Sequence, residues 1–456
     1  MKKLSLRAYF ALALAAILAL GAVVFSITYF VKADEWVTFS GSPHVYSGAN
    51  LSVGYVEDRD GTQLLDATDG RTYAEDAQTR ASTMHLLGDR YGYIYAPLLG
   101  AYADKMIGYD KINGLYTLRE EHSTATLSIS AAAQNAALQA LAGRRGTVGV
   151  YNYETGEILC AVTSPSYDPD NMPDVEGDTT GAYTGVYLNR FFDVTYTPGS
   201  IFKLVTSAAA IEEISDIDTQ SFACNGTSII GGQKIVCEGV HGTIDFKNGL
   251  AHSCNVVFGD IAVELGGKTH QKYAEKAGLT KRLDCDGYQT AAGSVDLTKA
   301  EDGDVAWAGI GQYTDQVSAY AFMRYMGIIA GGGEAAEPYL MSSVRKGEKT
   351  TYAAKRVSTG RVLEEETAQT LAEMMRYNVE NIYGAWQFGD LKVCAKSGTA
   401  EQEGQTANAM FAGFVQDESC PLAFVVFVEN GGSGSAVAAP IAAAVLQTCA
   451  AELQKN

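Results

Sequence analysis

Positively charged residues are scarce in this 456-residue sequence, which has 34 lysines and arginines against 53 aspartates and glutamates. The formal net charge is −19. Because nucleic acids are bound by basic faces, this balance excludes nucleic acid as an expected partner. The sequence also has no internal repeat, and its Gly/Ser tract NGGSGSA is too short to link two domains. Hydrophobic residues make up 47% of the chain, the fraction of a globular protein.

A long apolar run lies near the N-terminus. Ala8 to Val31 are 24 consecutive residues without a charge, and about 20 helical residues cross a bilayer core. Lys2, Lys3 and Arg7 precede the run, and Asp34 and Glu35 follow it soon after its end. The positive-inside rule therefore places the short N-terminus in the cytoplasm and everything after residue 33 outside it. A cleaved signal peptide is the alternative, but its apolar core is usually about 7 to 15 residues long. We expect a retained single-pass anchor over residues 1–34.

The rest of the sequence divides into two regions. Residues 35–140 are polar and rich in Gly and Asp, and they predict a small irregular domain with short strands that ends in an alanine-rich helix. Residues 141–456 begin with a hairpin pattern around Glu154-Thr155-Gly156. They end with two predicted strands, Ala409 to Gln416 and Leu422 to Asn430, and an apolar helix. Strands at both ends with helices between them predict one α/β domain.

The stretch TPGSIFKLVTSAAAI, Thr197 to Ile211, combines a helix start with a lysine on the buried face. Proline is tolerated in the first turn of a helix, and the apolar residues that follow recur at helical spacing. Because residues three apart share a helix face, the Ser200 hydroxyl and the Lys203 amine should lie within reach of each other. Burial lowers the pKa of a lysine, and a neutral amine can take a proton from a hydroxyl.

The Ser-x-x-Lys pattern alone is weak, because it occurs again at Ser343 and Lys346 in the polar run SSVRKGEK. There we expect Lys346 to be a solvated surface charge. Two further motifs occur once each in the sequence: Ser-x-Asn at Ser253 and Asn255, and Lys-Ser-Gly-Thr at residues 396–399, where an apolar run ends. The three motifs together, well separated and in this order, are a strong signal.

This motif set is shared by penicillin-binding proteins and serine β-lactamases. The chain resembles the class B penicillin-binding proteins, the membrane-anchored DD-transpeptidases that cross-link bacterial peptidoglycan. The resemblance covers residues from about 140 to 450 and includes the segments VGVYNYETGEILCAVTSPSYDP, GIIAGGGEAAEPYL, SCNVVF and KSGTAE. It implies an α/β fold of the penicillin-binding and serine β-lactamase type, an antiparallel sheet with helices, for residues 141–456. Residues 35–140 would form the family's small pedestal or dimerisation-type domain.

The resemblance implies a catalytic role for each residue of the first two motifs. Ser200 would attack a D-Ala-D-Ala amide and form a serine ester. Lys203 would be the base that activates it, and Ser253 would relay a proton to the leaving amine. Asn255 would hold the substrate's amide and fix Lys203; the alternative is that Asn255 only caps the following helix.

The third motif would bind the carboxylate of the stem peptide. In the family's pattern, Lys396 supplies the cation, and Ser397 and Thr399, beside Gly398, hydrogen-bond the carboxylate. The backbone N–H groups of Ser200 and Thr399 would form the oxyanion hole. The plainer alternatives are a solvated edge charge at Lys396 and an ordinary strand-end turn at 397–398.

The motifs leave several functions open within the class. A DD-carboxypeptidase would hydrolyse the same acyl-enzyme. A serine β-lactamase would need a water-activating carboxylate, which we do not identify. A β-lactam-binding sensor would signal across the membrane helix, but only three charged residues precede that helix. We therefore predict a monofunctional transpeptidase of the bacterial cell membrane that requires no cofactor. Its expected partners are stem peptides, β-lactams, the membrane and a polytopic glycan polymerase.

Eight cysteines allow for disulfides or a metal site. We expect five of them to be buried free thiols: Cys160, Cys285, Cys394, Cys420 and Cys449. The others fall near a histidine at intervals of 13, 4 and 13, as Cys224, Cys237, His241 and Cys254. Three interpretations stay open: a Cys224–Cys237 hairpin disulfide, unrelated thiols, or a structural zinc site that would hold the Ser-x-Asn loop from behind. The spacing differs from a short Cys-x-x-Cys knuckle, which favours the disulfide.

Overall fold

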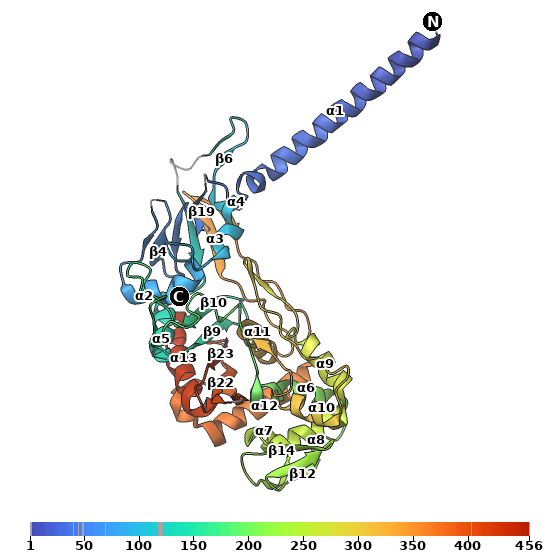
Figure 1. Cartoon of the computed structure of the whole chain (residues 1–456), viewed down its shortest axis with the longest axis vertical. Helices are drawn as coiled ribbons and strands as arrows, with labels where there is room; N and C mark the ends of the chain where they lie inside the picture. Colours follow the sequence, from blue (N-terminus) through green and yellow to red (C-terminus); the bar gives the residue numbers. More distant parts are fainter. Residues whose placement is uncertain are drawn as a thin grey trace.

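The computed structural model describes residues 2–39, 41–43, 45–47, 50–68, 70–116, 122–402 and 404–455. Helix α1 (Lys2–Val37) projects alone from one end of an elongated molecule (Figure 1). Among the described residues, two helices are long and apolar enough to cross a membrane. Leu6–Val37 is not buried in the fold, whereas the most apolar part of Gly434–Leu453 is more than half buried. The second packs inside the fold, so the membrane span predicted from the sequence corresponds to α1.

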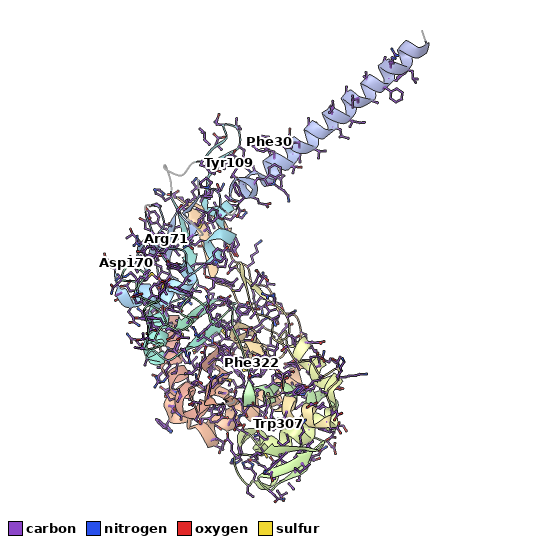
Figure 2. All side chains as sticks on the ribbon, in the orientation of Figure 1. Phe30, Arg71, Tyr109, Asp170, Trp307 and Phe322 are labelled. Carbon is purple, nitrogen blue, oxygen red and sulfur yellow. The ribbon has the colours of Figure 1, made fainter. Side chains whose placement is uncertain are left out.

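A small hairpin braces the base of α1. Strands β6 (Tyr109–Asp110) and β7 (Leu115–Tyr116) run beside the helix end, and the labelled Phe30 and Tyr109 lie close together there (Figure 2). The Lys111 amine donates a hydrogen bond to the Phe30 carbonyl oxygen at 2.8 Å and pairs with the Asp34 carboxylate at 2.7 Å.

The N-terminal sheet has six strands in the order β20-β19-β8-β3-β4-β5, of which only β3 and β8 pair in parallel. The strands are β3 (Tyr55–Glu57), β4 (Gln63–Asp66), β5 (Thr72–Tyr73), β8 (Ser123–Leu127), β19 (Met341–Lys346) and β20 (Lys349–Ala353). The accompanying elements are β1 (Tyr46–Ser47), β2 (Asn50–Leu51), α2 (Ala77–Leu87), α3 (Pro97–Ala101) and α4 (Ala103–Met106). Two strands of this sheet thus come from the region 141–456.

The second sheet has five antiparallel strands in the order β10-β9-β23-β22-β21. They are β9 (Gly146–Asn152), β10 (Ile158–Ser164), β21 (Val393–Gln402), β22 (Gln405–Val415) and β23 (Leu422–Val428). Strands from both ends of the 141–456 region therefore close one sheet, as the sequence predicts. Strand β22 begins earlier than the predicted strand, because polar residues at its start still pair with β21.

Helices cover both faces of the five-stranded sheet and divide the interior into two cores. Val150 and Phe424 face one core with α5 (Ala131–Leu141) and α13 (Ala439–Leu453). Tyr151 and Phe427 face the other, with α11 (Ala319–Ala330). Because neighbouring residues of a strand point to opposite faces, apolar runs such as LAFVVFV fill both cores at once. Helix α5 packs with α13, so the boundary predicted at 140 falls inside an element of the C-terminal part.

Helical segments and short hairpins make up much of the rest of residues 141–456. The helices are η1 (Gly199–Phe202), α6 (Lys203–Glu213), α7 (Phe246–Ala251), α8 (Asn255–Leu265), α9 (Gly267–Lys276), α10 (Asp302–Gly309) and α12 (Glu365–Asn378), followed by η2 (Val379–Tyr383), η3 (Ala385–Phe388) and η4 (Gly434–Ala438). The strands are β11 (Thr195–Tyr196), β12 (Ser221–Cys224), β13 (Thr227–Ile230), β14 (Gln233–Val236), β15 (Gly242–Asp245), β16 (Asp284–Cys285), β17 (Tyr288–Gln289) and β18 (Val317–Ser318). Hairpins β12–β15 and β13–β14 lie farthest from α1 (Figure 1).

Candidate active site

The Ser200 hydroxyl lies 3.0 Å from the Lys203 amine nitrogen. Ser200 belongs to the 3₁₀ turn η1, and the α-helix begins only at Lys203, three residues later than the predicted helix start. Side chains three apart are eclipsed in a 3₁₀ turn, so the hydroxyl lies directly over the lysine. The pairing predicted from the sequence is confirmed, with a tighter turn than expected.

Lys203 is fully buried and has three further contacts in the Ser-x-Asn loop. Its amine nitrogen lies 2.6 Å from the Ser253 carbonyl oxygen, 3.1 Å from the Ser253 hydroxyl and 2.7 Å from the Asn255 side-chain oxygen. Burial lowers the pKa of Lys203 well below its usual value, and the nearby Lys396 charge lowers it further. The geometry thus favours a neutral amine beside the serine.

The Ser-x-Asn loop is held in a strained conformation before α8. Ser253 has a backbone φ of 55°, in the left-handed region that non-glycine residues rarely adopt. Asn255 is the first residue of α8, whose N-cap is Cys254, so the alternative that Asn255 only caps this helix is wrong. Its side-chain amide donates to the Val236 carbonyl at 2.8 Å, while its side-chain oxygen faces Lys203.

Lys396 lies inside strand β21 and is fully buried. Its amine donates hydrogen bonds to the Ser253 hydroxyl at 3.1 Å and to the Ser397 carbonyl at 2.8 Å. Burial lowers the pKa of Lys396 to about 7, against an opposing effect of Glu238. The alternative of a solvated edge charge is therefore wrong. The alternative of a turn at 397–398 is also wrong, because Ser397 and Gly398 pair with Phe411 and Met410 of β22.

Small residues let the serine turn approach β21, the edge strand of its sheet. A side chain at Gly199 would place its Cβ 2.8 Å from the Thr399 carbonyl oxygen. A Cβ at Gly398 would lie 3.0 Å from Ile201 and 3.2 Å from the Pro198 carbonyl oxygen. Glycine at these positions therefore brings Ser200 next to the segment 396–399. The oxyanion hole at Ser200 and Thr399 stays a prediction.

Tyr383 is a site residue that the sequence analysis missed. Its hydroxyl lies 3.3 Å from the Lys396 amine and accepts hydrogen bonds from the Ser397 N–H at 3.2 Å and the Ser397 hydroxyl at 3.1 Å. Tyr383 ends the short segment η2 and belongs to no motif. Only the strand packing brings it to Lys396, so no local signal identifies it.

The second Ser-x-x-Lys copy does not form a pair of this kind. Ser343 and Lys346 lie on β19 of the N-terminal sheet. Side chains three apart on a strand point to opposite faces, so the serine and lysine of this copy are kept apart.

The three cysteines and the histidine come together behind the Ser-x-Asn loop. The ligand atoms of Cys224, Cys237, His241 and Cys254 all lie within 4.8 Å of one another. All eight cysteines of the chain are unbonded, so the favoured Cys224–Cys237 disulfide is not formed in the structure. The other five thiols are buried apart from this cluster, as predicted.

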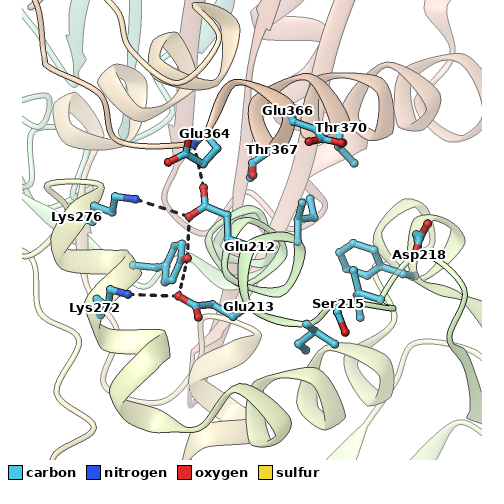
Figure 3. A pocket seen from close by; sticks show the side chains of 15 residues that line it. Glu212, Glu213, Ser215, Asp218, Lys272, Lys276, Glu364, Glu366, Thr367 and Thr370 are labelled. Atoms are coloured by element: carbon cyan, nitrogen blue, oxygen red, sulfur yellow. Dashed lines mark hydrogen bonds and ion pairs between the residues drawn. The ribbon is translucent and has the colours of Figure 1, made fainter.

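A cleft of about 630 Å³ lies at the opposite end of α6 from Ser200 (Figure 3). The ion pairs Glu212–Lys276 and Glu213–Lys272 cross it at 3.7 and 3.3 Å, and Glu212 also accepts a hydrogen bond from the Glu364 N–H. None of the motif residues lines this cleft, and the carboxylates of Glu212 and Glu213 are paired with lysines. We therefore assign the chemistry to the Ser200 cluster instead.

A model of the penicillin binding protein transpeptidase domain matches residues 146–447. The chain belongs to this family. It is 28% identical over 335 residues to the peptidoglycan D,D-transpeptidase PbpA of Mycobacterium tuberculosis. The aligned region covers 66% of this chain and 66% of PbpA.

Solved structures of penicillin-binding proteins share the fold. A ceftriaxone acyl-enzyme complex of penicillin-binding protein A from M. tuberculosis has a TM-score of 0.75 at 23% identity and covers 87% of this chain and 98% of that one. The D,D-transpeptidase domain of a peptidoglycan glycosyltransferase from Eggerthella lenta has a TM-score of 0.75 at 25% identity, with coverages of 88% and 98%. The predicted family and fold class are confirmed.

Proposed function

We propose that this penicillin-binding protein is a peptidoglycan DD-transpeptidase that works through a Ser200 acyl-enzyme and is acylated by β-lactams at the same serine. The observation that carries the proposal is the contact between the half-buried Ser200 hydroxyl and the buried Lys203 amine, beside the Ser-x-Asn loop and β21. The D,D-transpeptidase PbpA of M. tuberculosis and the ceftriaxone acyl-enzyme of penicillin-binding protein A support it.

The hydrogen-bond partners of Lys203 explain how Ser200 is activated. The Ser253 carbonyl and the Asn255 side-chain carbonyl can only accept hydrogen bonds, so they take two N–H groups of the lysine. A neutral amine has two N–H groups and one lone pair. With both N–H groups engaged, the lone pair faces the hydroxyls of Ser200 and Ser253, so it can accept the Ser200 proton. Lys203 is therefore the general base in the acylation step.

The reaction then proceeds in two steps, acylation of Ser200 and transfer of the acyl group to an acceptor amine. The Ser200 oxygen bonds to the carbonyl carbon of the penultimate D-alanine while its proton passes to Lys203, and the C–N bond to the terminal D-alanine breaks. The proton reaches the leaving amine through the Ser253 hydroxyl, which contacts Lys203. An acceptor amine then attacks the ester, and Ser200 leaves with a proton. In a β-lactam the broken C–N bond lies in a ring, so the leaving group stays attached.

The third motif supplies the positive charge for the substrate carboxylate. Lys396 in its protonated form, with the hydroxyls of Ser397 and Thr399, would bind the terminal carboxylate of the stem peptide or of the drug. Tyr383 holds Ser397 and Lys396 in place by hydrogen bonds. We assign Tyr383 as a positioning residue.

The β-lactamase alternative lacks a feature that it needs. Within the described residues, no carboxylate hydrogen-bonds to Ser200, Lys203, Ser253 or Lys396, which disfavours a water-activating base of the β-lactamase type. A DD-carboxypeptidase differs only in the acceptor, and the product ratio separates it from a transpeptidase. The location that fits a transpeptidase is the outer side of the bacterial membrane, with α1 as anchor and peptidoglycan as substrate. A polytopic glycan polymerase as partner stays a prediction.

Labelling of the full-length protein in detergent with fluorescent penicillin tests the proposal. Intact-mass analysis should show one added drug mass in the wild type and in Ser343→Ala, and none in Ser200→Ala. A full adduct on Ser200→Ala would refute the assignment. Incubation with a D-Ala-D-Ala donor and an acceptor amine should give transfer product, whereas hydrolysis product alone would indicate a carboxypeptidase.

A further inference from the structure

The Cys/His cluster lies at the meeting point of three segments of the hairpin region. Cys224 ends β12, Cys237 and His241 lie in the connection between β14 and β15, and Cys254 precedes α8. Cys224 and Cys254 are fully buried and Cys237 is 8% exposed. Each residue offers one ligand atom to the same point. The ligands thus converge from three parts of the chain that no local turn would bring together.

Two distances within the cluster match those of a tetrahedral zinc site. Zn–S bonds of about 2.3 Å and Zn–N bonds of about 2.0 Å place two sulfurs about 3.8 Å apart, and a sulfur and a nitrogen about 3.5 Å apart. The Cys237 and Cys254 sulfurs are 3.7 Å apart, and the Cys237 sulfur is 3.5 Å from Nδ1 of His241. Bonded sulfurs would lie about 2.0 Å apart. The spacing therefore fits ligands around a common ion.

The surroundings of the cluster suit a closed site with thiolate ligands. The Asn255 backbone N–H points at the Cys237 sulfur at 3.3 Å, a hydrogen bond that stabilises a thiolate. Three soft sulfur ligands with one imidazole in a tetrahedral arrangement select zinc over hard cations such as Mg²⁺ or Ca²⁺. Four protein ligands leave no open position, which is the mark of a structural rather than a catalytic zinc site.

We propose that Cys224, Cys237, His241 and Cys254 bind one structural Zn²⁺, and that this ion positions the Ser-x-Asn loop for catalysis. Cys254 is the middle residue of that loop, between Ser253 and Asn255. Holding Cys254 from behind keeps Ser253 at its positive φ and turns the Ser253 and Asn255 oxygens toward Lys203. Without the ion, three thiols would be buried side by side and the strained Ser253 backbone would lose its support.

Metal analysis of the full-length protein, purified in detergent without chelator or reductant, tests the binding. We expect close to one zinc per chain in the wild type and in Cys420→Ser, a matched variant of a buried thiol outside the cluster. Cys254→Ser and His241→Ala should lose the zinc. Because Cys254→Ser can impair folding, Co²⁺ replacement in the wild type gives a second readout. Thiolate-to-cobalt charge-transfer absorption and tetrahedral d–d bands would support the site.

Two results would overturn the zinc proposal. Absence of zinc with a mass deficit of two hydrogens that is abolished by Cys224→Ser would establish the disulfide instead. Absence of zinc with eight thiols that react after denaturation would establish free cysteines.

The positioning role rests on the proposed function, and a second experiment separates the two. Zinc is removed with a chelator, and acylation by fluorescent penicillin is resolved into the affinity of the first complex and the rate constant of the covalent step. Misplaced catalytic groups cost on the order of 10- to 100-fold, and we expect this loss in the rate constant, because β21 and its carboxylate-binding residues lie outside the cluster. Added Zn²⁺ should restore the rate, whereas Mg²⁺ should not.

An unchanged rate constant after complete zinc removal would overturn the positioning role. Failure of the proposed function would look different. In that case the zinc-loaded wild type itself would not be acylated at Ser200, while its zinc content would be unaffected.

Discussion

Lys203 and Lys396 share one hydrogen-bond partner: the Ser253 hydroxyl oxygen lies 3.1 Å from the amine nitrogen of each. Both lysines are fully buried. Burial lowers the pKa of each, and the charge of Lys396 lowers the pKa of Lys203 further. Two buried positive charges that share one hydroxyl are costly, so the cluster favours a state in which Lys203 has given up its proton and Lys396 keeps its own.

The first prediction is a bell-shaped pH profile for the second-order acylation rate of the free enzyme. The rate rises with pH as Lys203 loses its proton at its lowered pKa, because the neutral amine is the base. It falls as pH rises through the Lys396 pKa of about 7, because the carboxylate then loses its cation. The measurement is the rate of acylation by penicillin between acid and alkaline pH.

Lys396→Arg provides the control for this profile. The guanidinium stays protonated, so the falling limb should move beyond about pH 10 even if the absolute rate drops. A wild-type rate that keeps rising above neutral pH would contradict the assignment of Lys396 as the cation.

The second prediction concerns the base itself. Lys203→Arg keeps the positive charge but cannot deprotonate near neutral pH. The covalent step should slow by on the order of 100- to 10,000-fold, the usual contribution of a general base, while the affinity of the first drug complex changes little. Stopped-flow acylation resolves both quantities. Lys346→Arg, at the second Ser-x-x-Lys copy, should behave as wild type, and near-normal acylation of Lys203→Arg would mean a purely structural role.

The third prediction concerns Tyr383, the residue that has no motif. Tyr383→Phe removes the hydroxyl that accepts from Ser397 but keeps the ring packed against Phe411. We expect unchanged thermal stability within about 1 kcal/mol and weaker binding of carboxylate-bearing drugs. Measuring the drug affinity and the acylation rate separately distinguishes the two roles. Loss of affinity at unchanged stability indicates positioning, whereas a general loss of both quantities indicates a folding defect. Tyr377→Phe, which loses only a hydrogen bond to Asn248, is the matched control, and equal behaviour of the two variants would remove Tyr383 from the site.

Local patterns were sufficient to predict the reacting groups. The three-residue spacing of Ser200 and Lys203 predicts their contact, because the backbone alone determines which side chains share a helix face. Apolar runs such as Leu422 to Val428 predict strands for the same reason. The position of Lys396 was less clear, since an apolar run that ends at a lysine looks the same for a buried strand and for a solvated strand end. The hydrogen bond from Lys396 to the Ser253 hydroxyl makes the difference, and Ser253 comes from another part of the chain.

Pairings between strands far apart in the chain could not be predicted from local sequence patterns. Strand β19 pairs with β8 across more than two hundred residues, and nothing in the run SSVRKGEK indicates that partner. The sequence favours the disulfide over zinc because the cysteine spacing differs from a short Cys-x-x-Cys knuckle, and spacing does not reveal which residues meet. Only the fold shows that Cys254 and His241 reach the same point as Cys224 and Cys237.

The pairing of β8 with β19 has a mechanical consequence. The chain leaves the α1 end, enters the part that carries Ser200, and returns to complete the first sheet. The backbone hydrogen bonds between β8 and β19 therefore connect the N-terminal sheet with the part that carries Ser200. A flexible tether would let the serine sweep a wide range of heights above its anchor. The pairing of β8 with β19 instead holds the part that carries Ser200 against the first sheet, with α1 at one end of the molecule and the hairpin region at the other (Figure 1). Substrate strands would therefore have to reach the serine at a set distance from the membrane that holds α1.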